Sequence, residues 1–276
     1  MRFTKMHGTG NDYVFVDTTR EEVSAPSELA VDISRRHYGV GSDGLILIGD
    51  SERADVSMRI FNADGSEAEM CGNGIRCVGK YAYDHRLCRQ SELSVETPAG
   101  VRTIELHIDG DRAVAATVNM GQPGLRRGEI PMEGPPSESV VEEVLELSDR
   151  EVSITCISMG NPHCILTVPD IDALPWRKLG RELENHPVFP ERTNVHFVEV
   201  QSEEEVRMVT WERGSGATLA CGTGASAVCA ACNLENRTSP NILAHLPGGD
   251  LELQWGQEDR CIYMTGPAVE VFRGDW

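Results

Sequence analysis

The chain has 276 residues with a formal net charge of −19 at pH 7, and this negative field opposes binding to nucleic acid or to an anionic membrane. No apolar run reaches the roughly 18 residues of a membrane span, and the N-terminus has no signal-like segment, so we expect a cytoplasmic protein. In that setting the nine cysteines are better interpreted as free thiols than as a disulfide framework.

Short strand-like runs dominate the chain, with turn residues such as Asp109-Gly110 between them, which predicts antiparallel or mixed sheet. Strands are expected at 13–17, 45–48, 58–61, 101–108, 113–118, 164–168, 195–200, 206–211, 251–255 and 261–265. Helices are expected at 27–37, after Cys71, at 137–147, around 171–179 and after Cys221. Alternation at Val269 and Val271 predicts a last strand that returns to the first half.

One motif occurs twice, because Cys-Gly-Asn-Gly at 71–74 and Cys-Gly-Thr-Gly at 221–224 each precede a helical pattern, with the cysteines 150 residues apart. Gly-Asn pairs at 10–11 and 160–161 repeat at the same offset. The repeat favours two similar halves. We expect an N-terminal domain of 1–120 plus 266–276 that carries Cys71, and a C-terminal domain of 121–265 that carries Cys221. The alternative is a duplicated scaffold without a shared site.

The run at 225–232 is apolar or small on every side, so its helix should pass through the middle of its domain. We therefore predict an α/β (α+β) fold of two pseudo-symmetric domains. Each is a mixed, largely antiparallel sheet around a central helix, and the active site is expected in the cleft between the domains.

A cysteine just before a helix faces unpaired backbone amides, which should lower its thiol pKa and could also bind a carboxylate. If both motifs address one α-carbon, one thiolate could remove a proton from one face while the other thiol returns a proton to the opposite face. No metal site and no pyridoxal phosphate lysine is evident, so no cofactor is expected. A single Cys-Gly-x-Gly motif would more often be a turn with a buried cysteine.

Several polar residues lie beside the predicted strand ends and could either form turns or bind a substrate. Asn11, Asn62, Asn161 and Asn194 are of this kind, and an ordinary turn is the simpler interpretation of each. Glu212 and Arg213 offer both charges needed to bind an amino acid, although a solvated surface pair is the alternative.

These motifs together resemble the diaminopimelate epimerase family. The resemblance is carried by His-Gly-Thr-Gly-Asn-Asp at 7–12, Asn-Ala-Asp-Gly-Ser at 62–66, Gly-Asn-Pro-His at 160–163, Glu-Arg-Gly at 212–214 and the two cysteine motifs. It implies a pyridoxal-independent isomerase that interconverts LL- and meso-2,6-diaminopimelate for lysine and peptidoglycan synthesis, commonly as a homodimer.

The resemblance also implies roles for individual residues. Cys71 and Cys221 match the proton-transferring pair, and His163 and Glu212 match residues that support the acid–base chemistry. Matches to substrate-binding positions are Asn11, Asn62, Gly72, Asn73, Asn161, Asn194, Glu212, Arg213, Gly222 and Thr223. The sequence departs from many members at Ala217, where glutamate is common, and from some at Gly44, where glutamine occurs.

Three other functions compete with this prediction. A proline or hydroxyproline racemase or epimerase of the same fold would give Glu212 and Arg213 no distal amino acid group to bind. A thiol redox or metal-binding protein would use the pair Cys229 and Cys232, although no second pair completes four metal ligands. A relative of the same fold that catalyses another isomerisation would not be expected to keep the cysteine pair.

Overall fold

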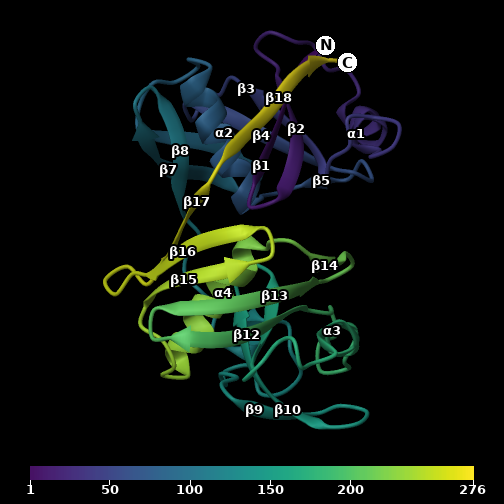
Figure 1. The fold of residues 1–276 in the computed structure, drawn as a ribbon, viewed down its shortest axis with the longest axis vertical. Helices are drawn as coiled ribbons and strands as arrows, with labels where there is room; N and C mark the ends of the chain where they lie inside the picture. The colour runs from purple at the N-terminus through teal and green to yellow at the C-terminus, as the bar shows by residue number, and fades with distance from the viewer. The chain divides into compact units, whose positions relative to one another are not determined.

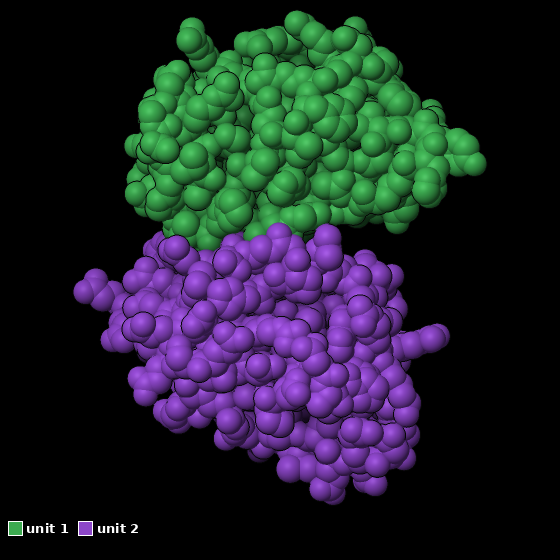
Figure 2. Space-filling view, in the orientation of Figure 1, with its two compact units in different colours: residues 1–119, 265–276 green, residues 120–264 purple.

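The computed structural model describes residues 1–276, which form two compact units (Figures 1 and 2). Unit 1 comprises Met1–Asn119 and Thr265–Trp276, and unit 2 comprises Met120–Met264. None of the helices is long and apolar enough to cross a membrane.

Unit 1 is a mixed sheet with a buried helix. Its elements are β1 (Arg2–Gly8), β2 (Asn11–Asp17), α1 (Pro26–Ser34), β3 (Gly44–Gly49), β4 (Val56–Asn62), β5 (Glu67–Ala68), α2 (Gly72–Asp84), β6 (Glu92–Thr97), β7 (Gly100–Asp109), β8 (Arg112–Asn119) and β18 (Val269–Asp275). Antiparallel pairs predominate, and β2/β3 and β4/β6 are parallel.

Unit 2 contains a second sheet and a second buried helix. Its elements are η1 (Arg127–Glu129), β9 (Glu143–Glu146), β10 (Glu151–Ser158), β11 (Pro162–Thr167), α3 (Trp176–Glu184), β12 (Asn194–Ser202), β13 (Glu205–Glu212), β14 (Gly216–Thr218), α4 (Gly222–Leu234), β15 (Asn241–Leu246) and β16 (Gly249–Trp255). The remaining strand, β17 (Ile262–Pro267), continues from unit 2 into unit 1.

The order of strand pairing is the same in both units, which confirms the internal repeat. In unit 1, β1/β2 is antiparallel, β2/β3 parallel, β3/β4 antiparallel and β4/β6 parallel. In unit 2, β10/β11, β11/β12, β12/β13 and β13/β15 follow the same sequence of orientations. The short strands β5 and β14 each add to the strand before the cysteine motif. Cys71 and Cys221 therefore follow corresponding strands and occupy equivalent positions in the two units.

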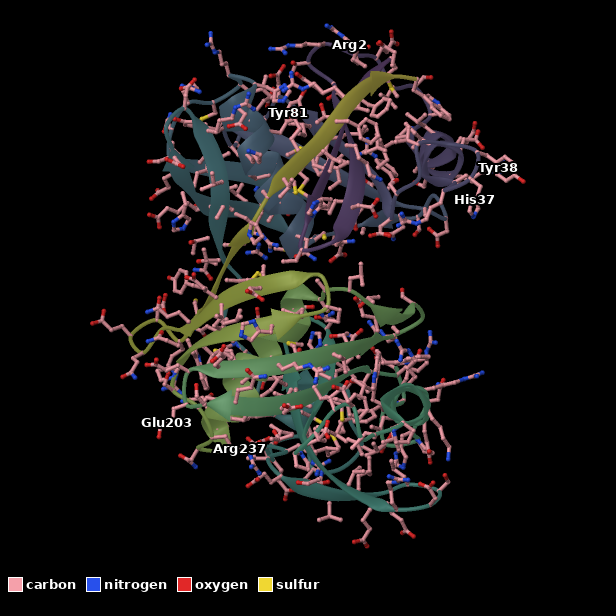
Figure 3. The ribbon with its side chains drawn as sticks, in the orientation of Figure 1. Arg2, His37, Tyr38, Tyr81, Glu203 and Arg237 are labelled. Atoms are coloured by element: carbon pink, nitrogen blue, oxygen red, sulfur yellow. The ribbon has the colours of Figure 1, made fainter.

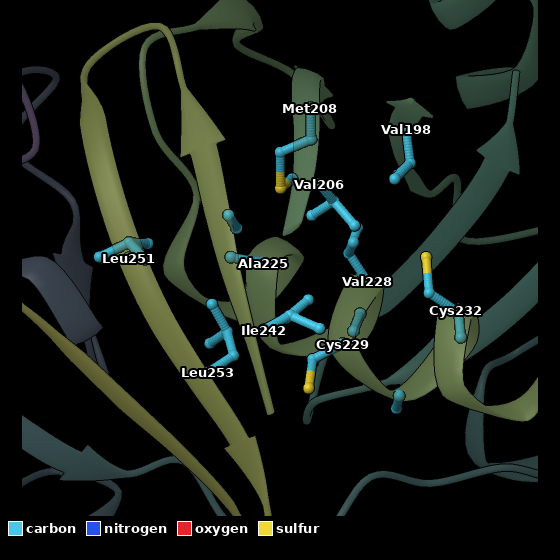
Figure 4. Close-up of a cluster of buried hydrophobic side chains, with 14 of the residues drawn as sticks. Val198, Val206, Met208, Ala225, Val228, Cys229, Cys232, Ile242, Leu251 and Leu253 are labelled. Atoms are coloured by element: carbon cyan, nitrogen blue, oxygen red, sulfur yellow. The ribbon is translucent and has the colours of Figure 1, made fainter. Parts of the chain in front are cut away.

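Each central helix is enclosed by strands from across its own sheet. Helix α4 packs against β10, β11, β12, β15 and β16, and nearly all of its residues from Gly222 to Cys232 are buried, as predicted (Figure 4). Helix α2 is buried from Gly72 to Tyr83 against β1, β2, β7 and β8. Small residues on α4 allow the strands to approach that helix closely.

The last strand returns to the first unit as predicted, because β18 pairs with β1 in antiparallel register. Elsewhere in unit 1, Tyr38, in the turn after α1, projects into solvent with 88% of its surface accessible (Figure 3).

Two helix predictions need correction. The predicted helix at 137–147 is wrong, because this segment contains strand β9, paired with β10. Its β-branched residues Val140, Val141 and Val144 suit extended backbone better than helix. The helix expected at 171–179 begins only at Trp176, after Pro175, and continues to Glu184. Proline fixes the backbone at a helix start but lacks the amide that a helix interior needs.

A surface histidine gives unit 2 a pH-dependent contribution to stability. The His245 ring lies 2.7 Å from Glu205 Oε1 and 2.8 Å from Asp250 Oδ1, and these hydrogen bonds raise its pKa. This contribution is fully present below the unfolded pKa near 6.5 and is lost as pH rises through the folded pKa.

We therefore expect His245→Gln to reduce the free energy of unfolding by up to about 1 kcal/mol near pH 5.5, and by progressively less towards pH 9. Urea denaturation across this pH range measures the difference. His107→Gln is the control, since His107 contacts the Thr117 hydroxyl and no carboxylate. A difference that grows with pH would contradict the assignment.

Candidate active site

The two predicted cysteines occupy the same position, the N-cap of a 13-residue central helix. Cys71 has φ −141° and ψ 115°, and Cys221 has φ −130° and ψ 108°. Extended backbone at the N-cap leaves the next three amides outside the helical hydrogen-bond ladder. In each unit a thiol therefore lies beside a helix N-terminus that favours an anion.

In unit 1, the thiol of Cys71 lies between residues of β2 and the first turn of α2. Gly74 N–H donates to Cys71 Sγ at 3.3 Å, and Sγ lies 3.4 Å from Asn11 Oδ1 and 3.8 Å from Tyr13 Oη. Asn73 Nδ2 donates to the same Asn11 oxygen at 3.3 Å. The predicted residues Asn11, Gly72 and Asn73 thus gather at Cys71.

The prediction that a helix N-terminus lowers the thiol pKa is wrong for Cys71. Burial raises its pKa, and the bonds from Gly74 and Tyr13 oppose that rise only in part. The desolvation cost of a thiolate outweighs the favourable amides when the site contains no substrate.

Asn62 lies further along the same sheet. It ends β4 opposite Gly44 of β3, and its Nδ2 donates to Ser66 Oγ at 3.0 Å. Its side chain therefore takes part in a turn, with no bond to the Cys71 cluster.

Gly44 is closely packed in this chain. A Cβ atom there would lie 2.2 Å from Phe61 O and 3.0 Å from Tyr13 Cε1. We expect Gly44→Ala to lower the free energy of unfolding by at least about 1–3 kcal/mol, because the β3/β4 pair must separate to admit the methyl group. An unchanged urea midpoint would contradict this prediction, because it would show that β3 and β4 accommodate the methyl group without loss of stability.

In unit 2, the thiol of Cys221 lies beside a hydroxyl and an amide. Its Sγ is 3.6 Å from Thr223 Oγ1, and Asn161 Nδ2 donates to that oxygen at 3.4 Å. Asn161 Oδ1 is in turn 2.9 Å from His163 Nε2. Asn161, His163, Gly222 and Thr223 therefore lie in one group with Cys221.

His163 is completely buried, and its pKa lies well below the ordinary value because of desolvation, His196 and Arg213. The neutral ring donates from one nitrogen and accepts at the other. His163 therefore acts here as a neutral hydrogen-bonding group.

Asn194, Glu212 and Arg213 form a second group in unit 2. Asn194 is buried beside β11, where its Nδ2 donates to Pro162 O at 2.9 Å and its Oδ1 accepts from Arg213 N at 3.0 Å. The Arg213 guanidinium donates to Glu191 O at 2.9 Å, and Glu212 accepts a 2.6 Å bond from Thr218. Both charged side chains are thus held in defined positions.

A buried carboxylate that the sequence did not reveal anchors this group. Glu184, at the end of α3, accepts from Trp211 Nε1 at 2.8 Å, Gly214 N at 2.9 Å and Arg192 Nη1 at 3.2 Å. These bonds fix both flanks of Glu212 and Arg213. No local motif indicates them, because the partners lie far apart in the chain.

Cys229 and Cys232 are structural, buried in the core of unit 2. All nine are free thiols, and burial raises the pKa of Cys229 and of Cys232 to about 12. No group of three or more histidine, cysteine or acidic side chains is arranged to hold a metal ion. The proposed redox or metal pair therefore has neither reactive thiols nor further ligands.

Unit 1 has a hollow of about 330 Å³ that is separate from the cysteine motif. Its lining includes Arg2 and Tyr81, which are labelled in Figure 3, and no cysteine.

Two duplicated units, each with a sheet around a helix whose N-cap is a cysteine, define a proline racemase-like fold. A probable proline racemase from Agrobacterium radiobacter is similar, with a TM-score of 0.71 over 100% of this chain and 92% of that one, at 14% identity.

The chain belongs to the diaminopimelate epimerase family, whose model matches residues 3–125 and 155–271. The diaminopimelate epimerase of Agathobacter rectalis is 48% identical, over 100% of this chain and 99% of its own length. That of Pelotomaculum thermopropionicum is 50% identical over 100% and 99%.

Proposed function

We propose that this enzyme interconverts LL- and meso-2,6-diaminopimelate without pyridoxal phosphate, in lysine and peptidoglycan synthesis. The observation that carries the proposal is the pair of cysteines at equivalent helix N-caps in duplicated units, Cys71 and Cys221. The full-length relatives that are named diaminopimelate epimerase support the substrate.

In the proposed reaction, the thiolate of one cysteine removes the α-proton and the thiol of the other donates a proton to the opposite face. The first thiolate becomes a thiol and the second thiol becomes a thiolate, so the proton balance closes. The amides at 72–74 and 222–224 would hold the α-carboxylate, with Asn73 and Thr223 at its sides, because helix N-termini stabilise negative charge that develops there.

The remaining site residues are assigned to binding and orientation. We assign Glu212 and Arg213, with Asn62 and Asn194, to the distal amino acid group, and Asn11 and Asn161 to orientation of the groups around each thiol. His163 supports the acid–base chemistry through its 2.9 Å bond to Asn161. The anchored charges of Glu212 and Arg213 suit a second, distal amino acid group, which proline lacks.

Exchange of α-protons in heavy water tests the substrate. We expect exchange with LL-diaminopimelate and none with L-proline, each without added pyridoxal phosphate. Exchange with proline alone would contradict the proposal and support the racemase alternative.

A cytoplasmic homodimer is part of the same proposal. Nine free thiols suit a reducing compartment. The last strand exposes Val269, Val271 and Phe272, and an exposed apolar strand of this kind suits contact with a second copy. Light scattering would give twice the chain mass, and a single-chain mass would contradict the dimer.

A further inference from the structure

A row of hydrogen bonds in unit 1 passes the N-terminus of α2 and ends on a carboxylate that the sequence did not single out. Arg76 Nη2 donates to Thr9 Oγ1 at 3.4 Å, and the Thr9 hydroxyl donates to Asn73 Oδ1 at 3.4 Å. Asn73 Nδ2 donates to Asn11 Oδ1 at 3.3 Å, and Asn11 Nδ2 donates to Asp43 Oδ2 at 2.7 Å. We call these five residues the polar row.

The charged groups at the two ends fix the direction of the bonds in the polar row. A guanidinium only donates and a carboxylate only accepts, whereas hydroxyls and carboxamides do both. The part of Asn11 that faces Asp43 must therefore be its NH2 group. The Asn11 oxygen then faces Asn73 and the sulfur of Cys71, which is 3.4 Å away. The same constraint turns the Asn73 oxygen towards Thr9.

Asp43 is itself held by three further hydrogen bonds. Its Oδ2 also accepts from Asp12 N at 3.0 Å, its Oδ1 accepts from Arg36 Nη2 at 2.8 Å, and its own N–H donates to Asp12 O at 2.7 Å. The same Arg36 nitrogen donates to Asp12 Oδ1 at 2.8 Å. Because both carboxylate oxygens are fixed by charge-assisted or backbone bonds, they give Asn11 one favourable orientation.

This orientation matters because Asn73 lies where the proposed function places the substrate α-carboxylate. A carboxamide has two N–H groups, so Asn73 can donate one to Asn11 and present the other to a carboxylate. Without Asp43, the Asn11 side chain could turn over and oppose its NH2 group to that of Asn73. A reversed Asn73 side chain would then present its oxygen to the carboxylate, and two acceptors form no hydrogen bond.

We propose that Asp43 is a positioning residue that orients the carboxamide of Asn11, and through it that of Asn73, for binding of the substrate α-carboxylate. The part of this inference that concerns substrate rests on the proposed function. The orientation itself is a property of the free protein. Asp43 lies 32 residues from Asn11 along the chain, and the two meet because β2 and β3 are paired.

Side-chain amide signals in proton–nitrogen correlation NMR spectra of the substrate-free, full-length protein test the orientation. The signals of Asn11 and Asn73 are assigned by their loss in Asn11→Ala and in Asn73→Ala. We expect both to shift in Asp43→Ala, because Asn11 loses its acceptor and its bond with Asn73 changes as a result. The Asn73 signal decides the test, since Asn73 bonds to Asn11 rather than to Asp43. An unshifted Asn73 signal would overturn the proposal.

A double-mutant cycle tests whether Asp43 acts through Asn11. Asp43→Ala should lower kcat/KM for diaminopimelate by about tenfold or more. In the Asn11→Ala background the further loss should be no more than about twofold, because the side chain that Asp43 orients is absent. Equal losses in both backgrounds would overturn the proposal. Asp43→Asn keeps the size of the side chain, should give an intermediate loss, and takes the place of Asp43→Ala if that variant does not fold.

Asp55→Ala is the matched control. Asp55 also lies in unit 1, and it accepts from both the N–H and the hydroxyl of Ser94 at 2.7 Å. We expect wild-type kcat/KM and unshifted signals of Asn11 and Asn73. Effects equal to those of Asp43→Ala would show a general response of unit 1 and overturn the assignment to Asp43.

The two readouts separate this proposal from the proposed function. The NMR measurement uses no substrate, so its failure would leave the epimerase assignment intact. The expected NMR shifts in a wild-type protein that does not epimerise diaminopimelate would instead reject the proposed function alone.

Discussion

Cys71→Ala and Cys221→Ala should each reduce epimerisation of diaminopimelate by at least about 10³-fold, because each variant removes the proton donor or acceptor on one face of the α-carbon. Neither thiol can replace the other, since inversion needs one group on each face. A coupled assay of meso-diaminopimelate formation from the LL isomer measures the loss.

Cys229→Ala is the matched control for these variants. Cys229 lies on the same helix as the Cys221 N-cap, but it is buried in the core of unit 2 and contacts Pro240 O. We expect full activity and at most a modest loss of stability. Loss of epimerisation in Cys229→Ala combined with retained epimerisation in Cys71→Ala would contradict the assignment of the two catalytic cysteines.

Glu184→Ala should raise KM for diaminopimelate by about tenfold or more and lower the free energy of unfolding by about 2–4 kcal/mol. The substitution removes the acceptor of three hydrogen bonds and releases the flanks of Glu212 and Arg213. Steady-state kinetics and urea denaturation measure the two effects separately.

Two further variants of the same helix make the Glu184 experiment specific. Glu184→Gln keeps one acceptor oxygen and should give intermediate values. Arg181→Ala changes an exposed residue and should alter stability by less than about 0.5 kcal/mol. An unchanged KM in Glu184→Ala would show that this anchor does not position the substrate-binding group.

Features that depend on local pattern could be predicted from the sequence. The doubled cysteine motif located both helix N-caps, and the small apolar run at 225–232 correctly indicated a buried helix. Strands with charged residues were harder to find. Strand β1 includes buried Lys5, which is paired with Asp12, so its polarity obscured the strand pattern.

Long-range partners could not be predicted for a physical reason. Glu184 meets Trp211, and His196 meets His163, only because strand order and register bring them together. The predicted direction of the Cys71 pKa shift was wrong for a similar reason. The sequence indicates the helix N-terminus, but it does not show the burial that raises the pKa of Cys71.

The most direct test of the two-thiol mechanism is the position of deuterium early in the reaction of LL-diaminopimelate in heavy water. The thiol that protonates the inverted carbon has exchanged with heavy water, so the product should carry deuterium at that carbon. The other thiol holds a single proton, the one it removed from the substrate, so it can return only that hydrogen and recovered LL substrate should retain it. Equal deuterium in product and recovered substrate would indicate a single base and contradict the assignment of Cys71 and Cys221 to opposite faces.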